Sequence, residues 1–87
     1  MTKNTWVVVD VNGPHSICLE HEYWSGRATI TVDNRIVYHR RRKIVDWGLK
    51  QTFSVNAMDC MVRITPMPWL TFRYQLWVDG KKQQPAQ

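Results

Sequence analysis

The chain has 87 residues, of which 44% are hydrophobic and 22% charged, with a formal net charge of +5 at pH 7. This length predicts one domain, since single domains span about 50–200 residues, and no apolar run approaches the roughly 20 residues of a membrane-spanning helix. The N-terminus lacks the apolar region of a secretory signal and two cysteines are too few for a disulfide framework, so we expect free thiols and a cytoplasmic location.

The first half of the chain predicts a run of short antiparallel strands. Residues 6–10, WVVVD, are β-branched and predict a first strand, which the Asn-Gly-Pro turn at 12–14 ends. Residues 15–33 form a hairpin pattern in which two arms alternate polar and apolar side chains around a loop at 22–26 that ends in glycine. Asp33 and Asn34 predict a second tight turn, and residues 35–39 predict a third arm with Ile36 and Tyr38 on one face.

The second half repeats this pattern after a break at residues 40–49. Alternation returns at 51–56, at 60–65 and in the longest strand, 70–78, whose outward parity includes Trp77. Pro66 and Pro68 predict a loop over residues 66–69, because proline cannot donate to a central ladder. Asp79-Gly80 predicts a turn, and residues 81–87 predict a frayed polar tail.

These patterns predict an all-β fold: a compact antiparallel β-sandwich of about seven or eight short strands, rich in meanders. The domain would span residues 1–82, with a polar tail at 83–87. Val32-Asp33-Asn34 and Val78-Asp79-Gly80 both end a strand in Val-Asp and a turn residue. We interpret this likeness as shared turn chemistry.

In this order, the landmarks of the chain resemble the Fas apoptotic inhibitory molecule family. The matching pattern is His15-x-Ile17-x-Leu19-Glu20-His21, Ser25-Gly26-Arg27, Ile30-x-Val32-Asp33, Gly48, Phe53-x-Val55 and Tyr74-x-Leu76-x-Val78-Asp79-Gly80-Lys81. The resemblance implies a compact β-sandwich without enzymatic activity that acts through protein association. It also implies a cytoplasmic role, since animal family members oppose apoptosis triggered by death receptors.

The histidines and cysteines do not predict a catalytic or metal site. His15 and His21 are six residues apart on one strand, which separates their Cα atoms by about 20 Å, too far for one zinc ion. We expect each imidazole to end a buried row and to bond backbone at the sheet rim. Without a phosphate loop, a nucleophile elbow or a spaced carboxylate pair, we expect neither an enzyme nor a cofactor.

The basic run at residues 39–43 has two interpretations. It could protect a sheet edge from aggregation, or it could bind an anionic partner such as nucleic acid with help from flanking aromatic side chains. Binding through one cluster would be weak and salt-dependent, and the other cations do not plainly join it in a stripe. The candidate partner-binding residues are Tyr38, Arg40, Arg41, Arg42, Lys43 and Trp47.

Three tryptophans fall in predicted turns, at Trp24, Trp47 and Trp69. They would cover the open end of the core or, if exposed together, would form a protein-interaction hot spot or a carbohydrate-stacking platform. The preferred function is a protein-interaction module with an unidentified protein partner. The alternatives are a small nucleic-acid-binding β-domain that uses the basic run, and a carbohydrate-binding module.

Overall fold

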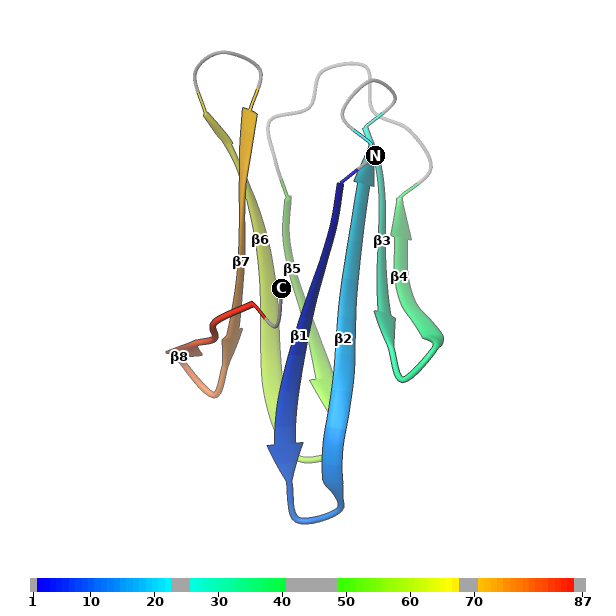
Figure 1. The fold of residues 1–87 in the computed structure, drawn as a ribbon, viewed down its shortest axis with the longest axis vertical. Coiled ribbons are helices and arrows are strands. Elements are labelled where there is room, and N and C mark those ends of the chain that lie inside the picture. Colours follow the sequence, from blue (N-terminus) through cyan, green and yellow to red (C-terminus); the bar gives the residue numbers. More distant parts are fainter. Residues whose placement is uncertain (1, 23–25, 41–48, 68–70, 86–87) are drawn as a thin grey trace. The chain divides into compact units, whose positions relative to one another are not determined.

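The computed structural model describes residues 2–22, 26–40, 49–67 and 71–85. Within these ranges the chain forms two antiparallel four-stranded sheets and no helix (Figure 1). The chain divides into two compact units, one for each sheet. The all-β class and the meander topology predicted from the sequence are confirmed.

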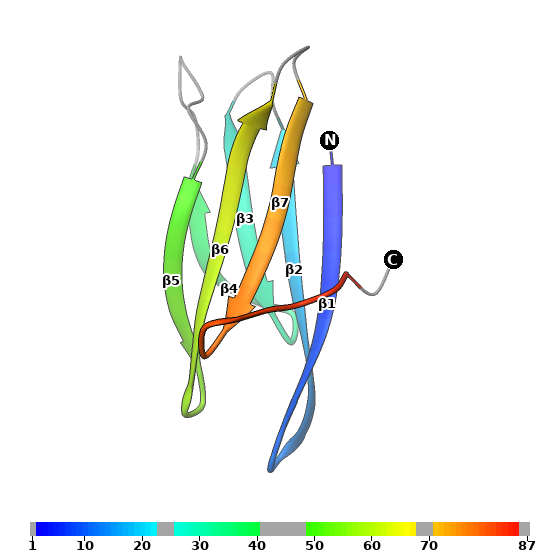
Figure 2. The same cartoon turned by 90° about the vertical axis from the view of Figure 1, so that its left-hand side faces the viewer.

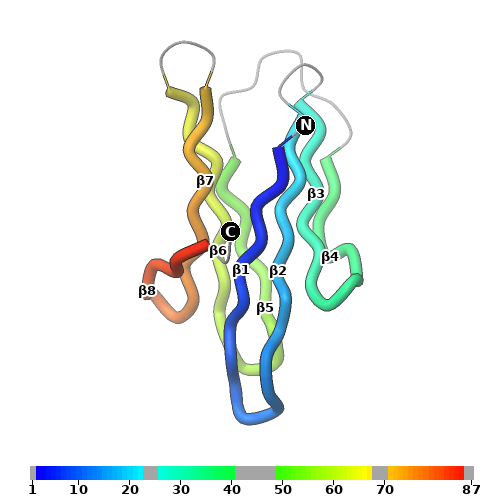
Figure 3. Tube along the Cα trace, in the orientation of Figure 1, coloured from blue at the N-terminus to red at the C-terminus, as the bar shows by residue number. Residues whose placement is uncertain are grey.

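The first sheet contains β1 (Thr2–Asp10), β2 (Gly13–Glu22), β3 (Arg27–Val32) and β4 (Arg35–Arg40) in chain order. The second contains β5 (Leu49–Val55), β6 (Met58–Met67), β7 (Thr71–Val78) and β8 (Lys81–Lys82), again in chain order. Within each sheet, every strand pairs with its sequence neighbours (Figure 3). β1 starts earlier than the predicted Trp6, because Thr2 to Thr5 pair with β2 despite their polarity.

One face of the first sheet is buried. Trp6 lies opposite Ile17, which lies opposite Val32, and Leu19 lies opposite Ile30, so these side chains share a face. The buried residues on this face are Trp6, Val8, Ile17, Leu19, His21, Ala28 and Ile30. The five large apolar side chains, Trp6, Val8, Ile17, Leu19 and Ile30, contribute about 1.5–3 kcal/mol each by burial, so this row stabilises the pairing of β1, β2 and β3.

β4 contains a bulge that overturns one prediction. Ile30 pairs with Tyr38 while Thr31 pairs with Ile36, so Val37 has no opposite residue. The extra residue reverses the alternation: Tyr38 joins the buried face, and Ile36 lies on the opposite face with 68% of its surface exposed. The prediction that Ile36 and Tyr38 share a face was therefore wrong, because period-two alternation fails across a bulge.

The second sheet also buries one face. In Figure 2 its strands β5, β6 and β7 run side by side. Register places Val62 opposite Leu76 and Cys60 opposite Val78. The buried residues are Val55, Cys60, Val62, Ile64, Leu76 and Val78, whereas Phe53, Phe72 and Tyr74 on the same face are half-buried. This inward row agrees with the sequence prediction.

Pro66 lies in a strand and not in the predicted loop. β6 continues to Met67, with Pro66 opposite Phe72 and Met67 opposite Thr71. β5 pairs with β6 only as far as Ile64, so in the described part of the chain the end of β6 has β7 alone as a neighbour. A strand with one neighbour tolerates proline, since one of its sides needs no N–H donor. Residues 68–70 lie outside the described residues.

The C-terminal tail is also more ordered than predicted. Lys81 and Lys82 form β8 against β7, and Gln83 N–H donates to the Leu76 carbonyl at 2.8 Å. The prediction that the chain frays from residue 81 is therefore wrong for residues 81–83. Local polarity does not reveal the backbone pairing that holds these residues.

The two sheets share one turn device, which we call the aspartate clamp. After β3, Asp33 N–H donates to Ser16 O and the Asp33 carboxylate accepts from Ser16 N–H, both at 2.9 Å. After β7, Asp79 N–H donates to Asp59 O at 2.8 Å and the Asp79 carboxylate accepts from Asp59 N–H at 2.9 Å. Both aspartates, and the turn residues Asn34 and Gly80, have positive φ. The Val-Asp likeness thus reflects the same turn chemistry, as predicted.

Candidate functional site

Only part of the predicted basic site falls on described residues. Tyr38 is half-buried on the buried face of the first sheet, and the Arg40 Nε–H donates to the Gly26 carbonyl at 2.8 Å. Arg40 therefore ties the end of β4 to the chain entering β3. Arg41, Arg42, Lys43 and Trp47 lie outside the described residues, as do Trp24 and Trp69, so partner binding through this run stays a prediction.

His15 joins two carboxylates near the β1–β2 and β3–β4 turns. Its Nδ1 lies 2.7 Å from Asp33 Oδ2 and its Nε2 lies 3.1 Å from Asp10 Oδ1. His15 thus bonds side chains and not the predicted backbone groups, because both turns place an aspartate beside it. With both ring nitrogens engaged, the imidazole acts as a cross-link between two turns.

The same contacts set the charge of this cluster. The hydrogen bond to Asp33, followed by the one to Asp10, raises the pKa of His15 above its ordinary value of 6.5. The hydrogen bond from His15, followed by that from Ser16 N–H, lowers the pKa of Asp33 below 3.8. These contacts therefore favour the protonated imidazole of His15 and the ionised carboxylate of Asp33 over their neutral forms.

The two cysteines are free thiols, as expected. Cys60 is 2% exposed, and its burial, with added effects of Asp79 and Asp59, raises the pKa of the thiol above 9.0. Cys18 is half-buried on the opposite parity. Because the thiolate is the reactive form, the raised pKa makes Cys60 a poor nucleophile.

Two kinds of feature are absent from the described residues. No group of three or more His, Cys, Asp or Glu side chains is placed to hold a metal ion. No helix in the described ranges is long and apolar enough to span a membrane. A small polar pocket of about 130 Å³ lies by Glu20, Glu22, Arg27 and His39, which is below the usual size of a small-molecule site.

The outward face of the first sheet is charged at one end, where Lys3, Glu20, Glu22 and Arg27 lie. The other end, toward the β1–β2 turn, presents an uncharged surface. Its rows are Val9 opposite Pro14, Val7 opposite Ser16, and Thr5, Cys18, Thr31 and Ile36 across the four strands. Val7 is 52% exposed and Val9 71%, and Val11 in the adjoining turn is fully exposed. We call the set Thr5, Val7, Val9, Pro14, Ser16, Cys18, Thr31 and Ile36 the uncharged face. Exposed apolar side chains that cluster in this way mark interaction surfaces.

The second sheet presents a basic face instead. Lys50 lies opposite Arg63, which lies opposite Gln75; Thr65 lies opposite Arg73; and Trp77 lies opposite Lys82. These side chains share the face turned away from the buried row. We call the set Lys50, Arg63, Arg73 and Lys82 the basic face. Within the described part of the chain none of the four forms an ion pair.

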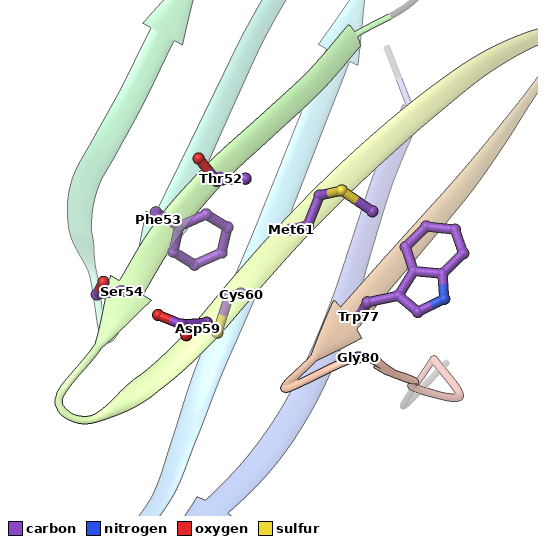
Figure 4. A pocket seen from close by; sticks show the side chains of 8 residues that line it. All are labelled: Thr52, Phe53, Ser54, Asp59, Cys60, Met61, Trp77 and Gly80. Carbon is purple, nitrogen blue, oxygen red and sulfur yellow. The ribbon is translucent and has the colours of Figure 1, made fainter.

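A shallow apolar depression adjoins the basic face. Its volume is about 680 Å³, within the range of ligand sites. Thr52, Met61 and Trp77 form one row across β5, β6 and β7, and the Met61 and Trp77 side chains line the depression with Asp59 and Ser54 (Figure 4).

Sequence reasoning missed both of these surfaces. The outward parity of Lys50, Arg63 and Arg73 can be read from each strand separately, but the strands lie far apart in the sequence. Only the β5–β6–β7 register brings these cations together. The alternation within each strand predicts that these cations face outward. The sequence does not show which strands pair.

A family model of the Fas apoptotic inhibitory molecule (FAIM1) matches residues 2–85, nearly the whole chain. The chain belongs to the Fas apoptotic inhibitory molecule family. No curated protein matches the chain significantly.

The landmarks that this family member shares with the family pattern have structural roles. Ile17, Leu19, Ile30, Leu76 and Val78 are buried, and the pattern's two aspartates form the aspartate clamps. The uncharged face and the basic face lie largely on other residues. In this Fas apoptotic inhibitory molecule domain the family pattern therefore specifies architecture, and the two exposed faces lie largely outside it.

Proposed function

We propose that the chain is a non-enzymatic protein-interaction module of the cytoplasm that binds its protein partner through the uncharged face. The observation that carries the proposal is the exposure of Val7, Val9 and Ile36 in the part of the first sheet's outward face where the described residues include no charged side chain. Burial of such side chains on association stabilises the complex by about 25 cal/mol for each Å² of apolar area removed from water.

The edge position of β1 supports the same proposal. Among the described strands β1 has one hydrogen-bonded neighbour, β2, so its other edge has backbone donors and acceptors that an added strand can use. A partner strand along β1 would place side chains beside Val7 and Val9. Family membership adds the expectation that the partner belongs to apoptotic regulation, as in animal members.

Site-specific photo-crosslinking tests this proposal. A photoreactive amino acid replaces Val9 in the protein expressed in its native cytoplasm, and a matched variant carries it at the exposed Gln84. We expect a discrete protein adduct from position 9 and not from position 84. Adding Val7→Lys to the position-9 variant should remove the adduct, since a charge on the face opposes apolar association.

Two outcomes would count against the proposal. Equal adduct yields from both positions would show non-specific proximity, and no adduct from position 9 would leave the uncharged face without a partner. An adduct of twice the 10.3 kDa chain mass would identify a second copy as the partner.

A further inference from the structure

The outward face of the second sheet concentrates positive charge. Lys50, Arg63, Arg73 and Lys82 lie on it, and among the described residues of its strands Asp59 is the one acidic side chain of that parity. The outward rows of the first sheet carry no such excess, because Glu20 and Glu22 balance Lys3 and Arg27. The net charge of +5 is therefore gathered in part on one surface.

The pairing within this face departs from the usual rule for sheets. Lys50 and Arg63 are directly opposite each other, and Arg73, paired with Thr65, lies diagonal to Arg63. Like charges directly opposite destabilise an antiparallel pair, and no ion pair offsets this within the described residues. Like charges are expected to face each other where a binding role outweighs the loss of stability that they cause. An anionic ligand would relieve the repulsion.

The depression beside these cations supplies an aromatic surface. Trp77 is half-buried, lies opposite Met61 and is diagonal to Arg63. A flat indole next to a thioether can hold a planar ring, and base stacking on an aromatic side chain contributes to binding for every base type. The polar lining, Asp59, Ser54 and Thr52, leaves hydrogen-bonding groups at the rim of this surface.

We propose that the basic face binds single-stranded nucleic acid. Lys50, Arg63 and Arg73 contact consecutive phosphates, and one base enters the depression against Trp77 and Met61. Every nucleotide of a single strand carries a phosphate and a planar base. This combination fits a site with three cations beside one aromatic surface. An acidic peptide supplies the charge but carries a ring only at particular positions. This site lies on a different sheet from the uncharged face, so it is independent of the proposed protein partner.

The lining of the depression predicts a base preference. The Asp59 carboxylate accepts no hydrogen bond within the described residues, and a carboxylate accepts from the exocyclic amino group of cytosine. Uracil presents a carbonyl oxygen at the same position, which a carboxylate repels. We therefore expect oligocytidylate to bind more tightly than oligouridylate.

Fluorescence anisotropy of a labelled twelve-nucleotide oligocytidylate tests the proposal. Single-strand affinity falls with salt at a logarithmic slope of about −0.7 per phosphate contacted. Three contacts give a slope of about −2, so raising KCl from 50 to 200 mM should weaken binding about 20-fold. The Trp77→Ala variant should bind at least about fivefold more weakly, and Trp77→Phe should retain much of the affinity.

Charge variants locate the site. Arg63→Gln with Arg73→Gln should reduce the salt slope to about −0.7, the value for one phosphate contact. The control, Lys3→Gln with Arg35→Gln, removes the same charge from exposed positions of the first sheet and should leave the slope at about −2. Oligouridylate should bind about fivefold more weakly than oligocytidylate, and Asp59→Ala should abolish that difference.

Three results would overturn the proposal. The first is no saturable binding at 50 mM KCl, and the second is an equal loss of affinity in the control and the Arg63/Arg73 variants. The third is displacement of oligocytidylate by a twelve-residue oligoglutamate at equal concentration, which would identify the face as a site for acidic protein segments.

Discussion

His15 shows how one side chain gains a structural role from its surroundings. By sequence it is a histidine at the start of an alternating arm, but the fold places a carboxylate at each ring nitrogen, at 2.7 Å from Asp33 and 3.1 Å from Asp10. The cross-link connects two turns of the first sheet. Its strength depends on the protonation of the imidazole and of Asp33.

Stability should therefore depend on pH around this cluster. The pKa of His15 is raised, so its contribution is complete below about pH 6.5 and is lost as pH rises through the higher folded value. The pKa of Asp33 is lowered, so its contribution is present above about pH 3.8 and is lost as pH falls through the lower folded value. We expect thermal unfolding to show the largest contribution of the cluster between these limits.

The control for this prediction is His15→Gln, which keeps a hydrogen-bonding side chain without a titrating charge. The difference in unfolding temperature between the wild type and this variant should be greatest near pH 5 and should shrink toward pH 9. A difference that stays constant from pH 5 to pH 9 would contradict a charged role for the imidazole.

At the scale of elements, the aspartate clamps fix where strands turn. Asp33 and Asp79 each follow a buried-face valine, adopt positive φ and bond the backbone of the preceding strand in both directions. Aspartate tolerates this left-handed conformation better than most residues. Each clamp therefore sets both the turn and the register of the hairpin that it closes.

Removing one clamp should destabilise the protein measurably. Asp79→Ala loses a charge-assisted hydrogen bond and places alanine at φ 49°, and we expect a loss of about 1–2 kcal/mol in urea unfolding. The matched control is Asp59→Ala, because the backbone of Asp59 makes the clamp and its side chain does not. Equal losses in both variants would show that the carboxylate of Asp79 is not what matters.

Two elements show why strand patterns alone mislead. The bulge at Val37 puts Ile36 and Tyr38 on opposite faces, although their spacing of two residues predicts one shared face. Pro66 extends β6 because β5 does not reach that far. In both cases the deciding fact is what lies on the neighbouring strand, which a local pattern does not contain.

At the scale of the whole molecule, the predicted single domain of residues 1–82 can be tested by unfolding. Ile17 is fully buried in the first sheet and Ile64 is 2% exposed in the second. If the two sheets unfold together, Ile17→Ala and Ile64→Ala should each cost about 2–5 kcal/mol and shift one shared transition in urea.

The measurement needs probes that report on each sheet. Amide exchange followed by mass spectrometry gives separate protection for β1–β4 and β5–β8 in each variant. Ile17→Ala should reduce protection in both sheets by the same free energy. Loss of protection confined to the first sheet would show two independently folding units.

The sequence by itself determined the all-β class, the strand order, the buried rows and most turns. These follow from alternation and from residues such as Gly26, Asp33 and Gly80, which act over a few neighbouring positions. Family membership was also readable from the sequence, since the pattern consists of those same buried and turn residues.

Tertiary structure decided which exposed residues lie together. The cross-link of His15 with Asp10 and Asp33, and the joining of Lys50, Arg63 and Arg73 beside Trp77, depend on strand register. The cause is physical: burial leaves a strong periodic signal in each strand, whereas charged side chains on the solvent face carry no local mark of their cross-strand neighbours. Local patterns along the chain therefore predict the fold, whereas strand pairing decides which exposed side chains lie together.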